Sequence, residues 1–160
     1  MQGDQGVLDR LNTLLTGELS AADQYLAHSR AMEDMGLKAL YERIAHERME
    51  ELEHADKLIR RILFLEGTPN VASRDPLRIG KTVPEMLRND LTLEYEVVAA
   101  LKEAIAYCEQ VHDYDTRRIL VELLFDTEED HAHWLEQQLR LIDLLGLQNY
   151  LQSAMGSISN

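Results

Sequence analysis

The chain has little of what interrupts or cross-links a protein. Its one cysteine, Cys108, cannot form an internal disulfide, which favours a reducing compartment. Only three prolines and eight glycines occur among 160 residues, so long unbroken helices are expected. No apolar run approaches the roughly 20 residues that span a bilayer, and the first residues lack the basic and apolar regions of a signal peptide. We therefore expect a cytoplasmic protein without membrane contact.

Basic residues are also scarce. The chain has 16 lysines and arginines against 29 aspartates and glutamates, giving a net charge of -13. Because binding to nucleic-acid phosphates requires basic residues, we expect no nucleic-acid partner. An acidic surface can concentrate cations, although solubility is the simpler explanation of the charge alone. A chain of this length can bury a substantial core, and we expect one domain over residues 1–160.

Apolar residues recur every three or four positions along most of the chain, as in helices that bury one face. We expect an all-α fold: a four-helix bundle, one long crossover loop and a short C-terminal fifth helix. The expected helices cover residues 4–35, 37–66, 82–111 and 114–144, with the tail helix at 147–155. Residues 67–81 look irregular and are long enough to return along the bundle, which lets the second and third helices run parallel.

Short motifs mark the expected helix ends. Gly36 suits the left-handed conformation that ends the first helix, and Gly67 followed by Pro69 ends the second. Thr82 and Glu85 are spaced as a capping box at the start of the third helix. The short tail helix follows a complete bundle, so it either meets other subunits or packs back on its own bundle.

Glutamates and histidines occupy inward positions on the four long helices. Two Glu-x-x-His pairs lie 77 residues apart, and two single glutamates lie 76 residues apart. A spacing of three puts a carboxylate and an imidazole on one helical face. The expected inward stripe of the fourth helix includes Val121, Leu124, Glu128 and His131. The full set of expected metal ligands and catalytic groups is Glu18, Glu51, His54, Glu94, Glu128 and His131.

This ligand set carries four carboxylates into an apolar core, where an uncompensated charge is very unfavourable. No lysine or arginine occupies the same stripe positions, whereas two divalent cations would balance the charge. Carboxylates with imidazoles suit iron or manganese better than calcium or structural zinc, and they form di-metal sites in helical bundles. From the similarity of the two halves, we expect Glu51 and Glu128 to bridge the metals. Glu18 and His54 would complete one metal, and Glu94 and His131 the other.

Other polar residues have two interpretations each. Tyr25 lies two turns from Glu18 and either serves the site, by bonding a metal-bound carboxylate or supplying an electron, or is an ordinary core tyrosine. His46 and Glu50 are four residues apart with Glu47 beside them. They form either a secondary iron site or a surface ion pair.

Several segments resemble the bacterioferritins and closely related bacterial ferritins. They are Gly17-Glu18-Leu19, Asp23-Gln24-Tyr25, His54-Ala55-Asp56, the run 61–67, Val111-His112-Asp113-Tyr114 and the run 146–152. The resemblance implies a ferritin-like bundle that assembles into a hollow shell of twenty-four subunits. Such a shell serves iron storage and detoxification: it oxidises Fe(II) with dioxygen or hydrogen peroxide and keeps a ferric mineral. The resemblance carries over all six ligands, and it links His46 and Glu50 to iron transfer at the cavity surface.

The position of the haem ligand departs from the haem-binding members of this family. Leu52 stands where those members have methionine, and a leucine side chain has no lone pair for iron. Met49, one turn earlier, is a weak substitute. We therefore expect no methionine-ligated haem b, as in haem-poor ferritin-type members, which can co-assemble with a haem-bearing paralogue. A ferredoxin that reduces the stored iron is a further partner that the resemblance implies.

Other functions are compatible with the same ligands. A di-iron oxygenase or a manganese catalase-like enzyme would use a similar site on a small substrate. A haem-binding bacterioferritin with a non-standard ligand is another alternative, and a shell subunit without an active site is a third. The absence of a Cys-x-x-Cys motif argues against a rubrerythrin-like peroxidase.

Overall fold

The computed structural model describes residues 1–157, and these residues form helices and connections without any strand. The helices are α1 (Gln5–Asp34), α2 (Lys38–Phe64), α3 (Val83–Gln110), α4 (Tyr114–Phe125), the π-helix η1 (Asp126–Ala132), α5 (His133–Leu145) and α6 (Leu147–Ala154). The predicted all-α class is confirmed. No helix in the described part of the chain combines the length and apolar character needed to cross a membrane.

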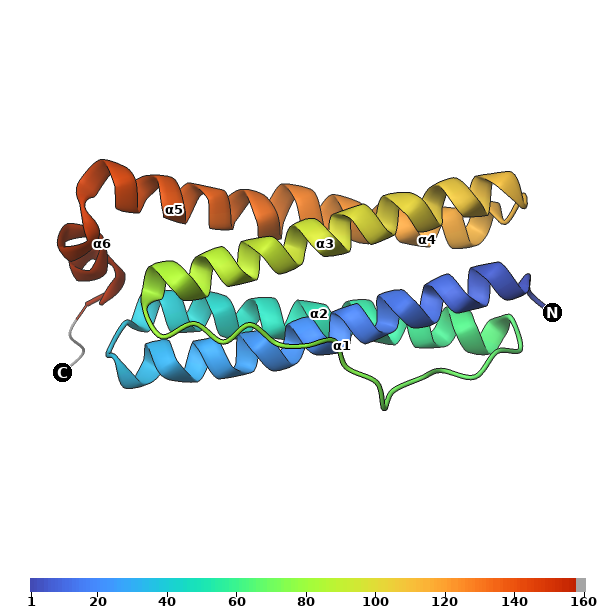
Figure 1. The fold of residues 1–160 in the computed structure, drawn as a ribbon, viewed down its shortest axis with the longest axis horizontal. Helices are drawn as coiled ribbons and strands as arrows, with labels where there is room; N and C mark the ends of the chain where they lie inside the picture. Colours follow the sequence, from blue (N-terminus) through green and yellow to red (C-terminus); the bar gives the residue numbers. More distant parts are fainter. Residues whose placement is uncertain (158–160) are drawn as a thin grey trace.

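Four long rods lie side by side in the bundle (Figure 1). Three of them are α1, α2 and α3, and the fourth is the continuous rod made of α4, η1 and α5. The connection from α2 to α3, residues 65–82, runs back beside α1 along the bundle, so α2 and α3 point the same way. This arrangement is the long crossover that the sequence predicts.

Local hydrogen bonds fix where the helices begin. The Asp4 carboxylate accepts from the backbone N–H of Val7 at 3.1 Å and caps α1. The predicted capping box opens α3: the backbone N–H of Glu85 donates to Thr82 Oγ1, and the Glu85 carboxylate accepts from the backbone N–H of Thr82. Gly36 has a φ of 79° just after α1, as expected for a glycine that ends a helix.

The end of α2 differs from the expectation that Gly67 terminates it. Glu66 takes the left-handed conformation, with φ of 62°, and the N–H of Gly67 donates to the carbonyl of Ile62 at 2.9 Å. A Cβ on Gly67 would lie 2.5 Å from Leu8 Cδ2. The glycine therefore leaves room for the Leu8 side chain of α1, while the residue before it makes the turn.

The fourth rod departs from a regular α-helix over the seven residues of η1. A π-helical turn holds one more residue than an α-helical turn, so residues before it shift by one position around the rod. The core positions before His131 are Leu120, Leu123 and Thr127 rather than the predicted Val121, Leu124 and Glu128. Val121, for example, is 41% exposed. The predicted register is thus wrong up to Glu128, within the π-helix, and right from His131 onward, including Leu135 and Ile142.

The tail helix α6 packs back on its own bundle, mainly against α5. Tyr150 is buried and its hydroxyl donates to Gln138 Oε1 at 2.9 Å, while Ala154 is buried one turn later. Leu147 and Met155 remain exposed. One face of α6 is therefore satisfied within the subunit, and the other is free to contact another subunit.

Candidate metal centre

Five of the six predicted ligands meet in the middle of the bundle. α1 supplies Glu18, α2 supplies Glu51 and His54, α3 supplies Glu94 and η1 supplies His131. Each of these five residues is at most 2% exposed. Their helices bring them together because each residue lies on the apolar stripe that the helix buries.

Glu51 lies between the two imidazoles. Its Oε1 is 2.7 Å from His131 Nδ1, and its Oε2 is 3.7 Å from His54 Nδ1. The two rings are nearly parallel, with centroids 5.7 Å apart. Glu18 Oε1 lies 3.8 Å from His54 Nδ1, and Glu94 Oε1 lies 3.7 Å from His131 Nδ1. The site therefore consists of two groups of three ligands that share Glu51.

Several buried polar atoms in these groups lack a hydrogen-bond partner. They are both carboxylate oxygens of Glu18 and His54 Nδ1, together with Glu51 Oε1 and His131 Nδ1, which lie close to each other without the geometry of a hydrogen bond. Buried polar groups almost always have a partner, because leaving one unpaired is unfavourable. These atoms are of the kinds that coordinate iron and manganese, so the residues fit a pair of divalent cations.

Without a metal, protons balance the charge of the site. Burial, and then the charge of Glu51, raises the pKa of Glu94 to about 7. The same two causes raise the pKa of Glu18 well above its usual value. Burial opposes a charged His54, but the nearby carboxylates of Glu18 and Glu51 outweigh burial and raise the His54 pKa to about 11. Metal binding would therefore displace protons from the site.

Glu128, the sixth predicted ligand, lies outside this group. Its side chain is 39% exposed and forms an ion pair with Lys102 of α3. The cause is the one-residue shift at the π-helix, which gives the inward position to Thr127. Of the two residues expected to bridge the metals, Glu51 lies between the imidazoles, whereas Glu128 lies away from them.

Tyr25 is buried beside the site, and its hydroxyl donates a hydrogen bond to Glu94 Oε1. Burial, and then the charge of Glu94, raises the pKa of Tyr25 well above its usual value, so the phenol keeps its proton. This hydrogen bond fits both interpretations of Tyr25, a residue that bonds a metal ligand and a core tyrosine whose hydroxyl is paired.

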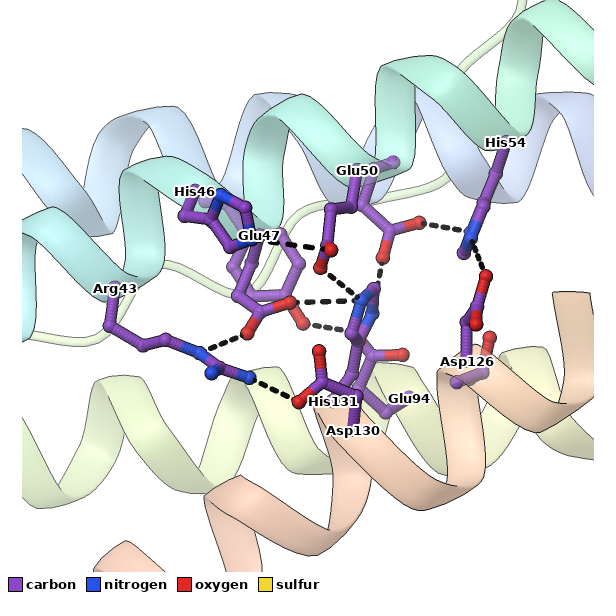
Figure 2. Close-up of polar contacts among 12 residues, drawn as sticks. Arg43, His46, Glu47, Glu50, His54, Glu94, Asp126, Asp130 and His131 are labelled. Carbon is purple, nitrogen blue, oxygen red and sulfur yellow. Dashed lines mark hydrogen bonds and ion pairs between the residues drawn. The ribbon is translucent and has the colours of Figure 1, made fainter.

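A further acidic group adjoins the far side of His131 (Figure 2). His131 Nε2 is 2.9 Å from Glu47 Oε2 and 2.9 Å from Glu50 Oε2. His46, which is exposed, lies with its Nε2 3.2 Å from Glu50 Oε1. The three residues predicted for a secondary iron site therefore lie together, with His131 linking Glu47 and Glu50 to the buried ligands.

Three residues at the site escaped the sequence analysis. Asp126 Oδ2 lies 3.2 Å from His54 Nε2, on the side of the ring away from Glu51. Asp130 and Arg43 pair with each other at 2.8 Å beside the acidic group. No motif or spacing identifies them, because each acts through a contact with a different helix. A carboxylate on the second nitrogen of each imidazole fixes the orientation of the ring.

The sequence is similar to that of known proteins along most of its length. The ferritin-like domain family matches residues 8–145. A bacterial ferritin of Synechocystis is 60% identical over 155 residues, which cover 97% of this chain and 99% of the relative. A bacterial ferritin of Pseudomonas aeruginosa is 61% identical over 153 residues, covering 96% and 99%. A bacterioferritin of Brucella melitensis is 43% identical over 152 residues, covering 95% and 94%.

Proposed function

This chain belongs to the family of bacterial ferritins and bacterioferritins, which store iron, and we propose that it is a ferroxidase that oxidises Fe(II) at its buried site and stores a ferric mineral. The observation that carries the proposal is the position of Glu51 between His54 and His131. One carboxylate shared by two imidazoles, with unpaired buried atoms around it, is suited to hold two cations side by side.

In this proposal two Fe(II) ions are the substrates. Glu18 and His54 would bind one ion, and Glu94 and His131 the other, with Glu51 between them. Each ion loses one electron. Dioxygen takes up the two electrons with two protons to give hydrogen peroxide, or hydrogen peroxide takes them up with two protons to give two water molecules. The protein positions the ions and balances their charge.

Glu128 completes the proposed set as the second bridging carboxylate. It would have to leave Lys102 and turn inward when the cations bind. Tyr25 would hold Glu94 in place through its hydrogen bond and could supply an electron to oxygen. Glu47, Glu50 and His46 form the proposed secondary iron site, next to His131.

We also propose that the subunits form a shell of twenty-four copies, alone or mixed with a haem-bearing paralogue. Leu52 cannot ligate iron, and Met49 is exposed on α2 at the surface of the subunit. No methionine-ligated haem b is therefore part of the proposal, and a low-spin haem spectrum of the purified protein would contradict it. A ferredoxin is the proposed reductant for iron release.

The test is an aerobic titration of the metal-free protein with Fe(II), followed by ferric absorbance, with Glu94→Ala and Glu96→Ala alongside. Glu96 is an exposed glutamate of the same helix, paired with Arg78, and serves as the matched control. We expect a fast phase that saturates near two irons per subunit and a slower uptake into a soluble core. Glu94→Ala should lose the fast phase, and Glu96→Ala should keep it.

If oxidation by the native protein were no faster than in buffer, the ferroxidase proposal would fail. Manganese with hydrogen peroxide would then be tested, because a manganese catalase-like enzyme could use the same ligands. If Glu96→Ala lost the fast phase as fully as Glu94→Ala did, the loss would reflect general acidity rather than the site.

A further inference from the structure

His131 and the three carboxylates around its outer side have the composition of a third cation site. Glu47, Glu50, Asp130 and His131 each offer one ligand atom, and these atoms lie within 4.8 Å of one another. His131 donates a hydrogen bond from Nε2–H to Glu50 Oε2. Glu47 Oε2 therefore has no hydrogen-bond donor, although Glu47 is almost fully buried. An unpaired carboxylate oxygen that points into the group indicates a missing positive partner.

A side chain of the protein already occupies part of this group. The guanidinium of Arg43 donates through Nε to Glu47 Oε1 and through Nη2 to Asp130 Oδ1, the latter at 2.8 Å. Figure 2 shows Arg43 reaching from α2 across to the rod that carries Asp130 and His131. A planar guanidinium suits this bridging role, because its N–H groups point at two carboxylates at once.

Arg43 and a metal ion would compete for the same carboxylates. Two of the four candidate ligand residues, Glu47 and Asp130, each accept a hydrogen bond from the guanidinium. A divalent cation held by those residues would also lie beside a like charge, and like charges at short range repel strongly in a half-buried site. Occupation of the group by Arg43 and occupation by a metal ion would therefore exclude each other.

The closed state is held in place and yet lies close to solvent. The Arg43 guanidinium stacks on Trp134, 5.0 Å from the ring centroid, which favours the bridging position. The side chain is 27% exposed, so its charged end can move out to water while its aliphatic stem stays packed. Withdrawal of one side chain is thus enough to open the group.

We propose that Arg43 is a built-in cation that closes the group of Glu47, Glu50, Asp130 and His131, and that it must withdraw before a metal ion occupies this group. Arg43 would then regulate the passage of iron to and from the buried site through the shared residue His131. The role in iron passage rests on the proposed function, whereas the competition between Arg43 and a metal ion does not.

The competition can be measured with Tb(III), a hard cation that binds carboxylates and emits when a nearby tryptophan is excited. The chain has one tryptophan, Trp134, and it lies against Arg43. The assembled, metal-free protein is titrated with Tb(III) under excitation beyond the tyrosine band. We expect Arg43→Gln to tighten the tryptophan-sensitised binding about fivefold or more, because the competing charge is gone.

Matched variants separate this effect from a general change of charge. Arg60→Gln removes the same charge from the same helix, where Arg60 forms an exposed ion pair with Asp56, and it should bind Tb(III) like the native protein. Adding Asp130→Asn to Arg43→Gln should abolish the gain. Arg43→Lys keeps the charge but cannot bridge the two carboxylates, so its affinity for Tb(III) should lie between those of the native protein and Arg43→Gln. Arg43→Lys also replaces Arg43→Gln in the comparison if Arg43→Gln does not assemble.

Equal binding by Arg43→Gln and Arg60→Gln would overturn the proposal. Weaker binding by Arg43→Gln would also overturn it, because Arg43 would then organise the ligands rather than compete for them. The Tb(III) signal requires no oxidation of iron. The result therefore stands apart from the Fe(II) titration, and either proposal can fail while the other holds.

Discussion

At the scale of single residues, the site combines groups whose charges balance only when a cation or a proton is present. Glu51 contacts both imidazoles, and burial opposes charge on every member of the group. Each imidazole has a carboxylate at both ring nitrogens. Glu51 lies at Nδ1 of both rings, whereas Asp126 lies at Nε2 of His54 and Glu50 at Nε2 of His131. Such outer carboxylates hold the ring in the orientation that a metal needs.

A comparison of Glu128 with its neighbour Glu129 tests whether Glu128 turns inward. Both are glutamates of η1; Glu129 is exposed, and Glu128 is partly exposed. We expect Glu128→Ala to slow the fast phase of Fe(II) oxidation at least about tenfold, equivalent to about 1.4 kcal/mol, and Glu129→Ala to leave it unchanged. Stopped-flow absorbance measures both rates. Equal rates for the two variants would show that Glu128 is no ligand.

Metal affinity should rise with pH. The pKa of His54 is raised to about 11 and that of Glu94 to about 7. His54 therefore holds a proton throughout the range from about pH 6 to about pH 8, Glu94 holds one mainly below about pH 7, and metal must displace these protons. We expect Co(II) affinity to increase from about pH 6 to about pH 8, with about two or more protons released per site. Absorbance titration and an indicator dye in weak buffer measure these quantities. A pH-independent affinity would contradict the proton balance described above.

At the scale of elements, the crossover segment 65–82 is held to the bundle by a buried polar network. The N–H of Gly80 donates to His28 Nε2 at 3.0 Å, so the proton of this ring lies on Nδ1, which donates to Asp90 at 2.8 Å. Gln24 donates to the same carboxylate and accepts from the N–H of Arg78. Two helical side chains, held by Asp90, thus anchor a segment that has no secondary structure of its own.

Loss of the Asp90 carboxylate should loosen this segment. Asp90→Ala leaves the buried donors of His28 and Gln24 unpaired, and we expect it to lower the free energy of unfolding by about 2–4 kcal/mol. Asp23→Ala, which breaks an exposed ion pair to Arg74 in the same segment, should cost less than about 1 kcal/mol. Denaturant unfolding gives the energies, and trypsin cleavage after Arg74 or Arg78 reports the loosening. Similar cleavage of the two variants would argue against the network.

At the scale of the whole molecule, a single subunit exposes apolar side chains that a shell would cover. Leu144, which precedes the turn into α6, is 74% exposed, and Leu145 and Leu147 beside it are exposed as well. Covering a leucine contributes about 2 kcal/mol, and exposed apolar groups of this kind mark contacts between proteins. This end of the bundle, where α5 meets α6, is therefore a candidate contact between subunits (Figure 1).

Assembly should depend on Leu144. We expect Leu144→Lys to give smaller species by multi-angle light scattering, because a charged side chain cannot be buried in an apolar contact without a partner. Asp143→Lys, at the adjacent exposed position, changes the net charge of the subunit more than Leu144→Lys does, and this variant should still assemble. Identical masses for the two variants would place the contact between subunits elsewhere.

The sequence by itself determined the helical class, the long crossover and the five of its six candidate ligands that the structure brings together. These features depend on local patterns: the spacing of apolar residues, the capping box at Thr82 and Glu85, and the Glu and His positions on helical stripes. The register from His131, near the end of the π-helix, through α5 followed from the same pattern.

Tertiary structure alone decided where Glu128 lies and what surrounds the imidazoles. The π-helix shifts the fourth rod by one residue, and no local signal distinguishes it from a continuous α-helix. Asp126 and Arg43 act on groups that are far away in the sequence, so their roles depend on which helical faces meet. Periodicity places a side chain on the face of its own helix, whereas only packing between helices brings it to its partner.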